Sequence, residues 1–307
     1  MRFLKGKRIR HESKMFYMFI GFWIVMFIFL NVIPMAYSFY LSLTNYDGLT
    51  TPSFIGVENY LNLIKDYRFI GSITNTLIFT FLNITITLIL SILLASILNK
   101  KIKGQGIFRS ILFLPYAVPV IATVYIWKTL LNRESGLINM ILGKISSGLY
   151  FNMLVDFPMV SLISVFIWQL GGSMIVFLAG FQNIPPELTE AAEIDGASPY
   201  TVFAKIKIPL LTPFIMYQII VGIMTSFSVI VQPILLTSSP GAAFTAFLNQ
   251  QPPSQIYFTI IYIFQRAFTN QSFGMAMAAS WYMLLVMIIV ALVFLRISRR
   301  FVFYEYE

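Results

Sequence analysis

Long apolar segments separated by short charged connections dominate the pattern of this 307-residue chain. Six stretches contain no Asp, Glu, Lys or Arg, namely residues 15–46, 69–99, 110–127, 157–186, 208–265 and 267–295. An α-helix needs about 20 predominantly apolar residues to cross a bilayer, and five of the stretches are close to that length. The stretch 208–265 is longer, and Ser-Ser-Pro-Gly at 238–241 and Gln-Gln-Pro-Pro at 250–253 interrupt it.

The pattern predicts an all-α polytopic membrane protein with six transmembrane helices, at about 16–41, 71–98, 108–130, 158–182, 210–236 and 272–296. Residues 238–258 follow the fifth helix as an external segment. Composition agrees with this class, because 58% of the residues are hydrophobic, only 11% are charged and the mean hydropathy is +0.80. We expect one membrane domain over 1–307, with a tail at 1–14, a core at about 70–300 and no soluble module.

The basic residues predict how the chain is oriented, since cytoplasmic connections of membrane proteins are enriched in Lys and Arg. Most of them lie in the N-terminal tail, in the second and fourth connections and after the last helix: Arg2, Lys5, Lys7, Arg8, Arg10, Lys14, Lys100, Lys101, Lys103, Arg109, Lys205, Lys207, Arg296, Arg299 and Arg300. Both termini are therefore expected in the cytoplasm. The net charge of +9 reflects this topology and not nucleic-acid binding.

Several kinds of chemistry are excluded or lack support. The chain has no cysteine, and its one histidine, His11, lies in the basic tail, so we predict no catalytic site and no metal site. No GxxxxGK[ST] phosphate loop is present, so the chain is not expected to hydrolyse ATP by that route. No predicted span carries a buried ionisable residue, which argues against transport driven by a proton or cation gradient.

Helix breakers, amides and hydroxyls stand out in the third to fifth spans, in the segments FLPYAVPV (113–120), WQLGGS (168–173) and MTSFSVIVQP (224–233), and amides and breakers are sparse in the second. They favour a wet pathway for a neutral polar solute such as a sugar. The alternative is that the glycines allow close helix packing and the hydroxyls bond to their own helix. Tyr116, Trp127, Trp168 and Trp281 could stack on sugar rings, although aromatic residues also gather at membrane interfaces.

The connection between the fourth and fifth spans, residues 184–209, predicts a helix-turn-helix. Pro185 and Pro186 suit the start of the first helix, and Gly196 suits a left-handed residue at its end. Ser198 is a natural N-cap of a second helix, which begins at Pro199 and is expected to bury Val202, Phe203 and Ile206. The acidic, small-residue surface of the first helix fits either a solvated connector or a helix that enters a groove of another protein.

Glu190-Ala191-Ala192, followed by Gly196, Ile206 and Pro209, resembles the "EAA" loop of ABC importer permeases. The fuller set of matching positions resembles the carbohydrate-uptake, maltose-type branch, and it comprises Glu190, Ala191, Ala192, Asp195, Gly196, Ala197, Phe203, Ile206, Pro209 and Pro213. The segments FLPYAVPV, GLIN (136–139), FLAGFQNIPPEL (177–188), FGMAMAAS (273–280) and the final YEYE are similar to that branch as well.

The resemblance implies a permease of the bacterial cytoplasmic membrane that forms a translocation path with a second permease. Two ATPase subunits, which hold ATP and Mg, would dock on the loops, with Glu190 pairing with a basic residue, and an extracytoplasmic solute-binding protein would deliver the sugar. By position, the sugar-path residues would be Tyr116, Trp168, Gln169, Gly172, Ser173, Thr225, Ser226, Ser228 and Gln232. The chain departs from the family at Ile208-Pro209, where Leu-Pro is usual, and at Ser226 and Ser228, where stronger hydrogen-bonding residues are common.

Three hypotheses remain open at this point. The first is a sugar or oligosaccharide importer, and the second is the same kind of importer for a peptide, a polyol, glycerol phosphate or an acidic saccharide. The third is a stand-alone secondary carrier or a membrane scaffold, and transport without any ATPase partner would contradict the first two.

Overall fold

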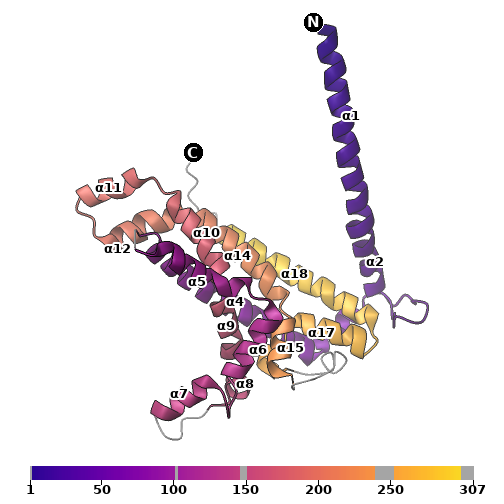
Figure 1. Ribbon diagram of the computed structural model, residues 1–307. Helices are drawn as coiled ribbons and strands as arrows, with labels where there is room; N and C mark the ends of the chain where they lie inside the picture. The colour runs from indigo at the N-terminus through magenta and orange to yellow at the C-terminus, as the bar shows by residue number, and fades with distance from the viewer. Residues whose placement is uncertain (1, 101–102, 146–150, 239–251, 299–307) are drawn as a thin grey trace.

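The computed structural model describes residues 2–100, 103–145, 151–238 and 252–298, and over these ranges the protein is helical, with a single isolated β-bridge between Thr44 and Phe54 and no strand. Figure 1 shows a bundle from which the first helix diverges. Three helices in the described ranges are long and apolar enough to cross a membrane, or up to six if each bent pair is one span. The fold class is confirmed, whereas the count of six spans stays a prediction.

The first predicted span is a helix broken only by a π-helical turn. It consists of α1 (Arg2–Phe27), η1 (Ile28–Val32) and α2 (Ile33–Ser42). Pro34 explains the π turn, because its ring cannot fit the regular α-helical spacing over the preceding carbonyl groups. The stretch Met15–Ser42 has none of its most apolar window buried in the chain, so lipid or another chain must cover it in the membrane.

The short helix α3 (Glu58–Lys65) and the long helix α4 (Tyr67–Leu98) come next. The buried Asn59 of α3 donates two hydrogen bonds, to the carbonyls of Ser42 (2.9 Å) and Thr44 (2.8 Å), and so ties α3 to the end of α2. Asp66 caps α4 by accepting from the backbone N–H groups of Arg68 and Phe69. The N-cap and the uninterrupted apolar sequence explain why α4 runs its full length without a break.

The third and fourth predicted spans are each a bent pair of helices. The pair α5 (Gln105–Ala117) and α6 (Val120–Leu130) meets at 98°, and the pair α9 (Pro158–Trp168) and α10 (Gly171–Gln182) meets at 50°. Pro119 sits at the N-cap of α6, where a missing N–H and a fixed φ are tolerated. Between the two pairs lie α7 (Leu137–Ile145) and α8 (Met153–Asp156), at the end of the molecule far from α11 (Figure 1).

The connection that was predicted as a helix-turn-helix forms α11 (Pro186–Ile194), α12 (Pro199–Val202), η2 (Phe203–Lys207) and α13 (Ile208–Leu210). The chain then enters α14 (Thr212–Phe227) and α15 (Val231–Thr237). The crossing predicted over 210–236 is not one continuous helix, because the backbone leaves the helical path between Phe227 and Val231. Pro233 accounts for the break: a continuous helix would place its ring against the carbonyl of Val229, whereas the first turn of a new helix accepts it.

After η3 (Ser254–Ile256), α17 (Thr259–Phe264) and η4 (Gln265–Thr269), the long helix α18 (Phe273–Ser298) completes the described fold. Most of the segment predicted to be external at 238–258 lies outside the described residues, as do the last two basic residues and the final YEYE. The end of α18 lies beside the start of α14, because the hydroxyl of Ser298 contacts the sulfur of Met216 at 3.8 Å.

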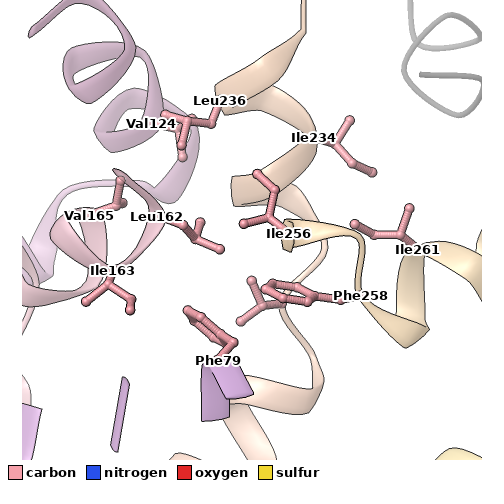
Figure 2. Close-up of a cluster of buried hydrophobic side chains, with 11 residues drawn as sticks. Phe79, Val124, Leu162, Ile163, Val165, Ile234, Leu236, Ile256, Phe258 and Ile261 are labelled. Atoms are coloured by element: carbon pink, nitrogen blue, oxygen red, sulfur yellow. The ribbon is translucent and has the colours of Figure 1, made fainter. Parts of the chain in front are cut away.

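The described part of the chain has three hydrophobic cores. One joins α3, α4, α17 and α18 around Leu63 and Tyr262, and the other two lie further along α4. Of these two, Figure 2 shows the one nearer α7, where side chains of α4, α6, α9, α15, η3 and α17 meet around Phe79, Leu162 and Ile256. The other core is made by α4, α10 and the start of α14, with Ala95, Phe177 and Leu211 at its centre. We call these the distal core and the proximal core, the latter being the one next to α11. Only α4 contributes buried residues to both.

Candidate functional site

A cavity of about 690 Å³ lies where the distal and proximal cores meet. It is lined by α4, α14 and the three helix breaks α5/α6, α9/α10 and α14/α15, so the breaks open at one site. Its polar and aromatic lining residues are Asn83, Thr87, Phe113, Tyr116, Phe166, Gln169, Ser173, Tyr217, Gln218, Thr225 and Gln232. Six of the nine residues proposed for the path line it: Tyr116, Gln169, Gly172, Ser173, Thr225 and Gln232.

Gln169 stabilises two breaks at once. It ends α9, and its side-chain amide donates to the hydroxyl of Thr123 at 3.2 Å and reaches the carbonyl of Val118 at 3.5 Å. Val118 lies between α5 and α6, where Pro119 removes a backbone donor. A polar side chain therefore supplies part of the hydrogen bonding that the broken helix lacks, as membrane-embedded breaks require.

Two glycines let α10 approach α5. A Cβ on Gly171 would fall 2.5 Å from the carbonyl oxygen of Leu112 and 2.9 Å from the Cα of Phe113, while one on Gly172 would fall 2.7 Å from the ring of Tyr116. The close-packing interpretation of these glycines is therefore correct. Gly172 also lines the cavity, so this residue both allows α10 to approach α5 closely and forms part of the cavity wall.

Gln218 of α14 is a lining residue that the sequence reasoning missed. Its side-chain amide donates to the hydroxyl of Ser173 on α10, which joins two walls of the cavity. The only signal in the sequence is that Gln218 is an isolated amide in an otherwise apolar stretch.

Asn83 and Thr87 of α4 also line the cavity, so the prediction that places the polar path in the third to fifth spans is incomplete. They belong to a row of small polar residues along one face of α4, namely Ser72, Thr76, Thr80, Asn83, Thr87 and Ser91, of which all but Thr87 are buried. Their spacing of three and four residues is the signal that could have found them, because such residues share one face of a helix.

Three of the proposed path residues do not line the cavity. Ser226 is buried behind the wall, where its hydroxyl accepts from the side chain of Asn83 at 3.4 Å. Ser228 is exposed and bonds to the carbonyl of Met224 in its own helix. Trp168 is half-buried at the end of α9. Among the other aromatic candidates, Trp127 packs against the distal core and Trp281 joins α18 to α2 through a 3.3 Å hydrogen bond to Ser38.

The cavity lining contains no Asp, Glu, Lys, Arg or His. The best-defined ion pair in the described chain lies elsewhere, at the start of α4, where Arg266 meets Asp66 at 2.5 Å and Tyr262 donates to the same carboxylate at 2.8 Å. Burial opposes ionisation of Asp66, but hydrogen bonds from Tyr262, the Arg68 backbone and Arg266 hold its pKa below the usual 3.8. Burial also raises the pKa of neighbouring Tyr257 to about 12. The lining itself offers neutral hydrogen-bonding groups and aromatic rings.

The helix-turn-helix has the local structure that its sequence predicts. Gly196 has φ +78°, and it closes α11 with two backbone bonds, from Gly196 to the Glu193 carbonyl (3.1 Å) and from Ala197 to the Ala192 carbonyl (2.9 Å). Ser198 caps α12 by accepting from the N–H of Thr201, and Pro186 is the first residue of α11.

The two arms of this unit differ in burial. No residue of α11 is buried, and Glu190, Ala191 and Asp195 are exposed. The second arm packs on the proximal core: Val202 is buried, while Phe203, Ile206 and Pro209 are half-buried. The ring of Phe203 stacks on that of Phe181 in α10, with centroids 6.3 Å apart. Figure 1 shows α11 as the outermost element at this end, with α12 between α11 and the rest of the bundle.

The chain resembles known proteins over nearly its whole length. Residues 87–303 match the family "Binding-protein-dependent transport system inner membrane component". The probable ABC transporter permease protein YesP of Bacillus subtilis is 30% identical over 98% of this chain and 96% of its own. The trehalose/maltose transport system permease protein MalF of Thermococcus litoralis is 30% identical over 79% of this chain and 84% of its own.

The sn-glycerol-3-phosphate transport system permease protein UgpA of Yersinia pestis is 29% identical over 84% of each chain. The crystal structure of a bacterial ABC transporter that imports the acidic polysaccharide alginate matches the fold with a TM-score of 0.78 at 23% identity, over 96% of this chain and 98% of that one. The chain belongs to the family of binding-protein-dependent transport system inner membrane components, and it is a multi-pass permease subunit of a sugar-type ABC importer and not an enzyme.

Proposed function

We propose that this permease imports a neutral sugar or oligosaccharide through the cavity at the three helix breaks. The observation that carries the proposal is the lining, which combines amides, hydroxyls and aromatic rings with no ionisable side chain. Such a lining replaces the hydrogen bonds of a hydroxyl-rich solute and offers rings for stacking, but it provides no counter-charge for an anion. The trehalose/maltose relative supports the same cargo class.

A second candidate cargo is an anion such as glycerol phosphate or an acidic saccharide, because one relative is a glycerol phosphate permease and the matched structure belongs to an alginate importer. Burying an unpaired anion is costly, and the lining has no Lys or Arg to offset that cost. The two cargoes are separated by ATP-dependent uptake into proteoliposomes of maltose, trehalose, sn-glycerol 3-phosphate and alginate oligosaccharides. Import of only the charged solutes would refute the neutral-sugar proposal.

We further propose that ATP hydrolysis on a partner subunit acts on this chain through α11. The acidic helix has no buried residue, and two large apolar side chains flank its end, Ile194 at 86% and Tyr200 at 78% exposure. A surface that combines exposed apolar residues with acidic ones is typical of a protein-binding site. We assign the partner as an ATPase subunit that holds ATP and Mg and pairs a basic residue with Glu190. Ala191, Ala192, Asp195 and Ala197 would face the same groove.

The remaining partners follow the family resemblance. A second, homologous permease would cover the exposed apolar surface of this chain and complete the path, and an extracytoplasmic solute-binding protein would deliver the cargo. With two ATPase subunits on the side of α11, that side and both termini are cytoplasmic. The basic residues concentrated in the connections and the tail support this orientation.

The coupling role is tested by Glu190→Lys in the assembled transporter in proteoliposomes. ATP-driven uptake is expected to fall at least tenfold, because a like charge replaces an attractive pair, while the permease still inserts and assembles. Reversing the basic partner residue on the ATPase to Glu should restore uptake. Glu134→Lys is the matched control, since Glu134 is exposed between α6 and α7 and undergoes the same change in charge. Normal uptake by the Glu190→Lys transporter would refute the coupling role.

A further inference from the structure

Four side-chain amides line the cavity. They differ in the hydrogen bonds that they already make to other residues of the protein. Gln169 donates to Thr123, and Gln218 donates to Ser173. Gln232 has no hydrogen-bond partner within the described residues. Asn83 is about nine-tenths buried, yet its two contacts are long: its amide lies 3.4 Å from the Ser226 hydroxyl, and its carbonyl oxygen lies 3.5 Å from the Thr87 hydroxyl.

These distances matter because N–H···O hydrogen bonds in proteins cluster near about 2.9–3.0 Å. An Asn side chain has two N–H donors and an acceptor oxygen with two lone pairs, and buried polar groups are normally paired. Asn83 therefore has unused capacity that points to a ligand bearing both donors and acceptors. A sugar hydroxyl is both a donor and an acceptor.

The position of Asn83 differs from that of Gln169 and Gln232. α4 passes the cavity as one continuous helix, whereas Gln169 and Gln232 lie at or next to helix breaks. α4 is also anchored in the distal and proximal cores, through Phe79 on one side of Asn83 and Ala95 on the other. A group on a continuous, anchored helix holds its position more closely than a group at a break.

We propose that Asn83 contacts the cargo and sets selectivity for its hydroxyl pattern, with Ser226 as the positioning residue that holds the Asn83 amide from behind. This deepens the proposed function and rests on it. Thr87, one turn along α4, holds the opposite end of the same amide. Ser226, one of the residues expected in the path, acts through Asn83 and not by touching the cargo.

The proposal is tested first by selectivity. Uptake of maltose and of its monodeoxy analogues is measured in proteoliposomes that hold the complete transporter. For Asn83→Leu, uptake of maltose is expected to fall roughly fivefold to tenfold, the cost of one neutral hydrogen bond, while the ratio of maltose to one monodeoxy analogue falls toward one. Asn83→Gln should retain part of the selectivity. The matched control is Thr80→Val on the same helix, since Thr80 bonds only to its own backbone and does not line the cavity.

The positioning role has its own readout. Ser226→Ala should lower selectivity partly, and the double variant Asn83→Leu/Ser226→Ala should behave like Asn83→Leu alone, because the two residues act through one contact. A double variant whose losses add would overturn the role of Ser226. An Asn83→Leu transporter with unchanged selectivity, or one that loses uptake of all analogues in equal proportion, would overturn the role of Asn83.

A second measurement does not depend on the cargo. The chain contains no cysteine, so Asn83→Cys and Thr80→Cys each introduce a single thiol. A small hydrophilic methanethiosulfonate reagent is expected to modify the first and to spare the second. An unreactive Asn83→Cys would overturn the proposal. If the wild-type transporter imports none of the sugars, the neutral-sugar function fails, and this reaction alone decides whether Asn83 faces the path.

Discussion

The paired glycines of α10 allow two adjacent substitutions with opposite expected results. Gly171→Ala places a methyl group 2.5 Å from a backbone oxygen of α5 and 2.9 Å from a backbone carbon. Backbone atoms cannot rotate away, so the two helices must separate by about 1 Å to reach ordinary van der Waals contact. Overpacking of this kind costs about 1–3 kcal/mol, and α10 is the main helix of the proximal core.

Gly172→Ala places its methyl group 2.7 Å from the ring of Tyr116 instead. That ring is 56% exposed, so it can turn away from α10 at little cost to the fold. Because Tyr116 and Gly172 both line the cavity, the displaced ring changes the shape of the cavity and not the packing of the helices. Gly172→Ala is therefore expected to alter uptake and to leave stability within about 0.5 kcal/mol of wild type.

The assay is thermal denaturation of the detergent-solubilised transporter, followed by size-exclusion chromatography, together with uptake in proteoliposomes. Only Gly171→Ala should lower the denaturation temperature. In a transporter that carries Tyr116→Ala, Gly172→Ala should have no further effect on uptake. In the same background, Gly171→Ala should still lower the denaturation temperature. A Gly171→Ala transporter as stable as wild type would refute the backbone-clash reasoning, as would rescue of its stability by Tyr116→Ala.

Two further predictions concern regions away from the cavity. Asp66→Asn should destabilise the assembled protein by roughly 1.5 kcal/mol at neutral pH, because it weakens hydrogen bonds between charged groups. The folded-state pKa of Asp66 lies below 3.8, so its contribution is present above that pH and is lost as the pH falls through the lower folded value. Denaturation curves of the variant and the wild type should therefore converge on acidification, and a constant difference down to pH 3 would contradict the ionic contribution. Gly196→Ala should cost about 1 kcal/mol locally, because φ +78° disfavours a Cβ. Hydrogen exchange of the α11 amides should then rise, with a smaller rise for Gly196→Asn, and unchanged exchange would show that the turn relaxes without cost.

The local features of the helix-turn-helix follow from a few neighbouring residues, which is why the sequence predicts them. Gly196 and Ser198 act through bonds to residues no more than five positions away. The same holds for Pro119, which ends one helix and starts the next. The break at Pro233 had an equally local cause, but the apolar sequence around it was interpreted as one continuous crossing.

The lining of the cavity depends instead on which way a helix faces, and an apolar span does not encode that in its composition. In a soluble helix, polar residues mark the outer face, whereas in lipid the outer face is apolar and a polar stripe marks the inside. The amide of Asn83 and the hydroxyl of Thr87 stand out only when the polar residues are sorted by helix face, and a comparison of whole segments does not reveal them. Ser228 shows the converse: it lies in a segment rich in hydroxyls, yet it does not line the cavity and it bonds to its own helix.

On the proposed coupling role, the arrangement of the distal and proximal cores indicates how a docked ATPase would change the cavity. The arm α12–η2 touches the bundle through Phe203 on Phe181, and Phe181 belongs to the proximal core. Phe181 and Gly172 lie on the same helix, α10, about 13 Å apart at 1.5 Å per residue, so a displacement of the arm reaches one wall of the cavity through a single rigid element. The opposite wall, formed by α6, α9 and α15, packs on the distal core, and the helix breaks separate it from that displacement. Close-packed cores transmit strain, and broken helices interrupt it. A displacement of α11 by the docked partner should therefore move the proximal wall relative to the distal wall and change the shape of the cavity between them.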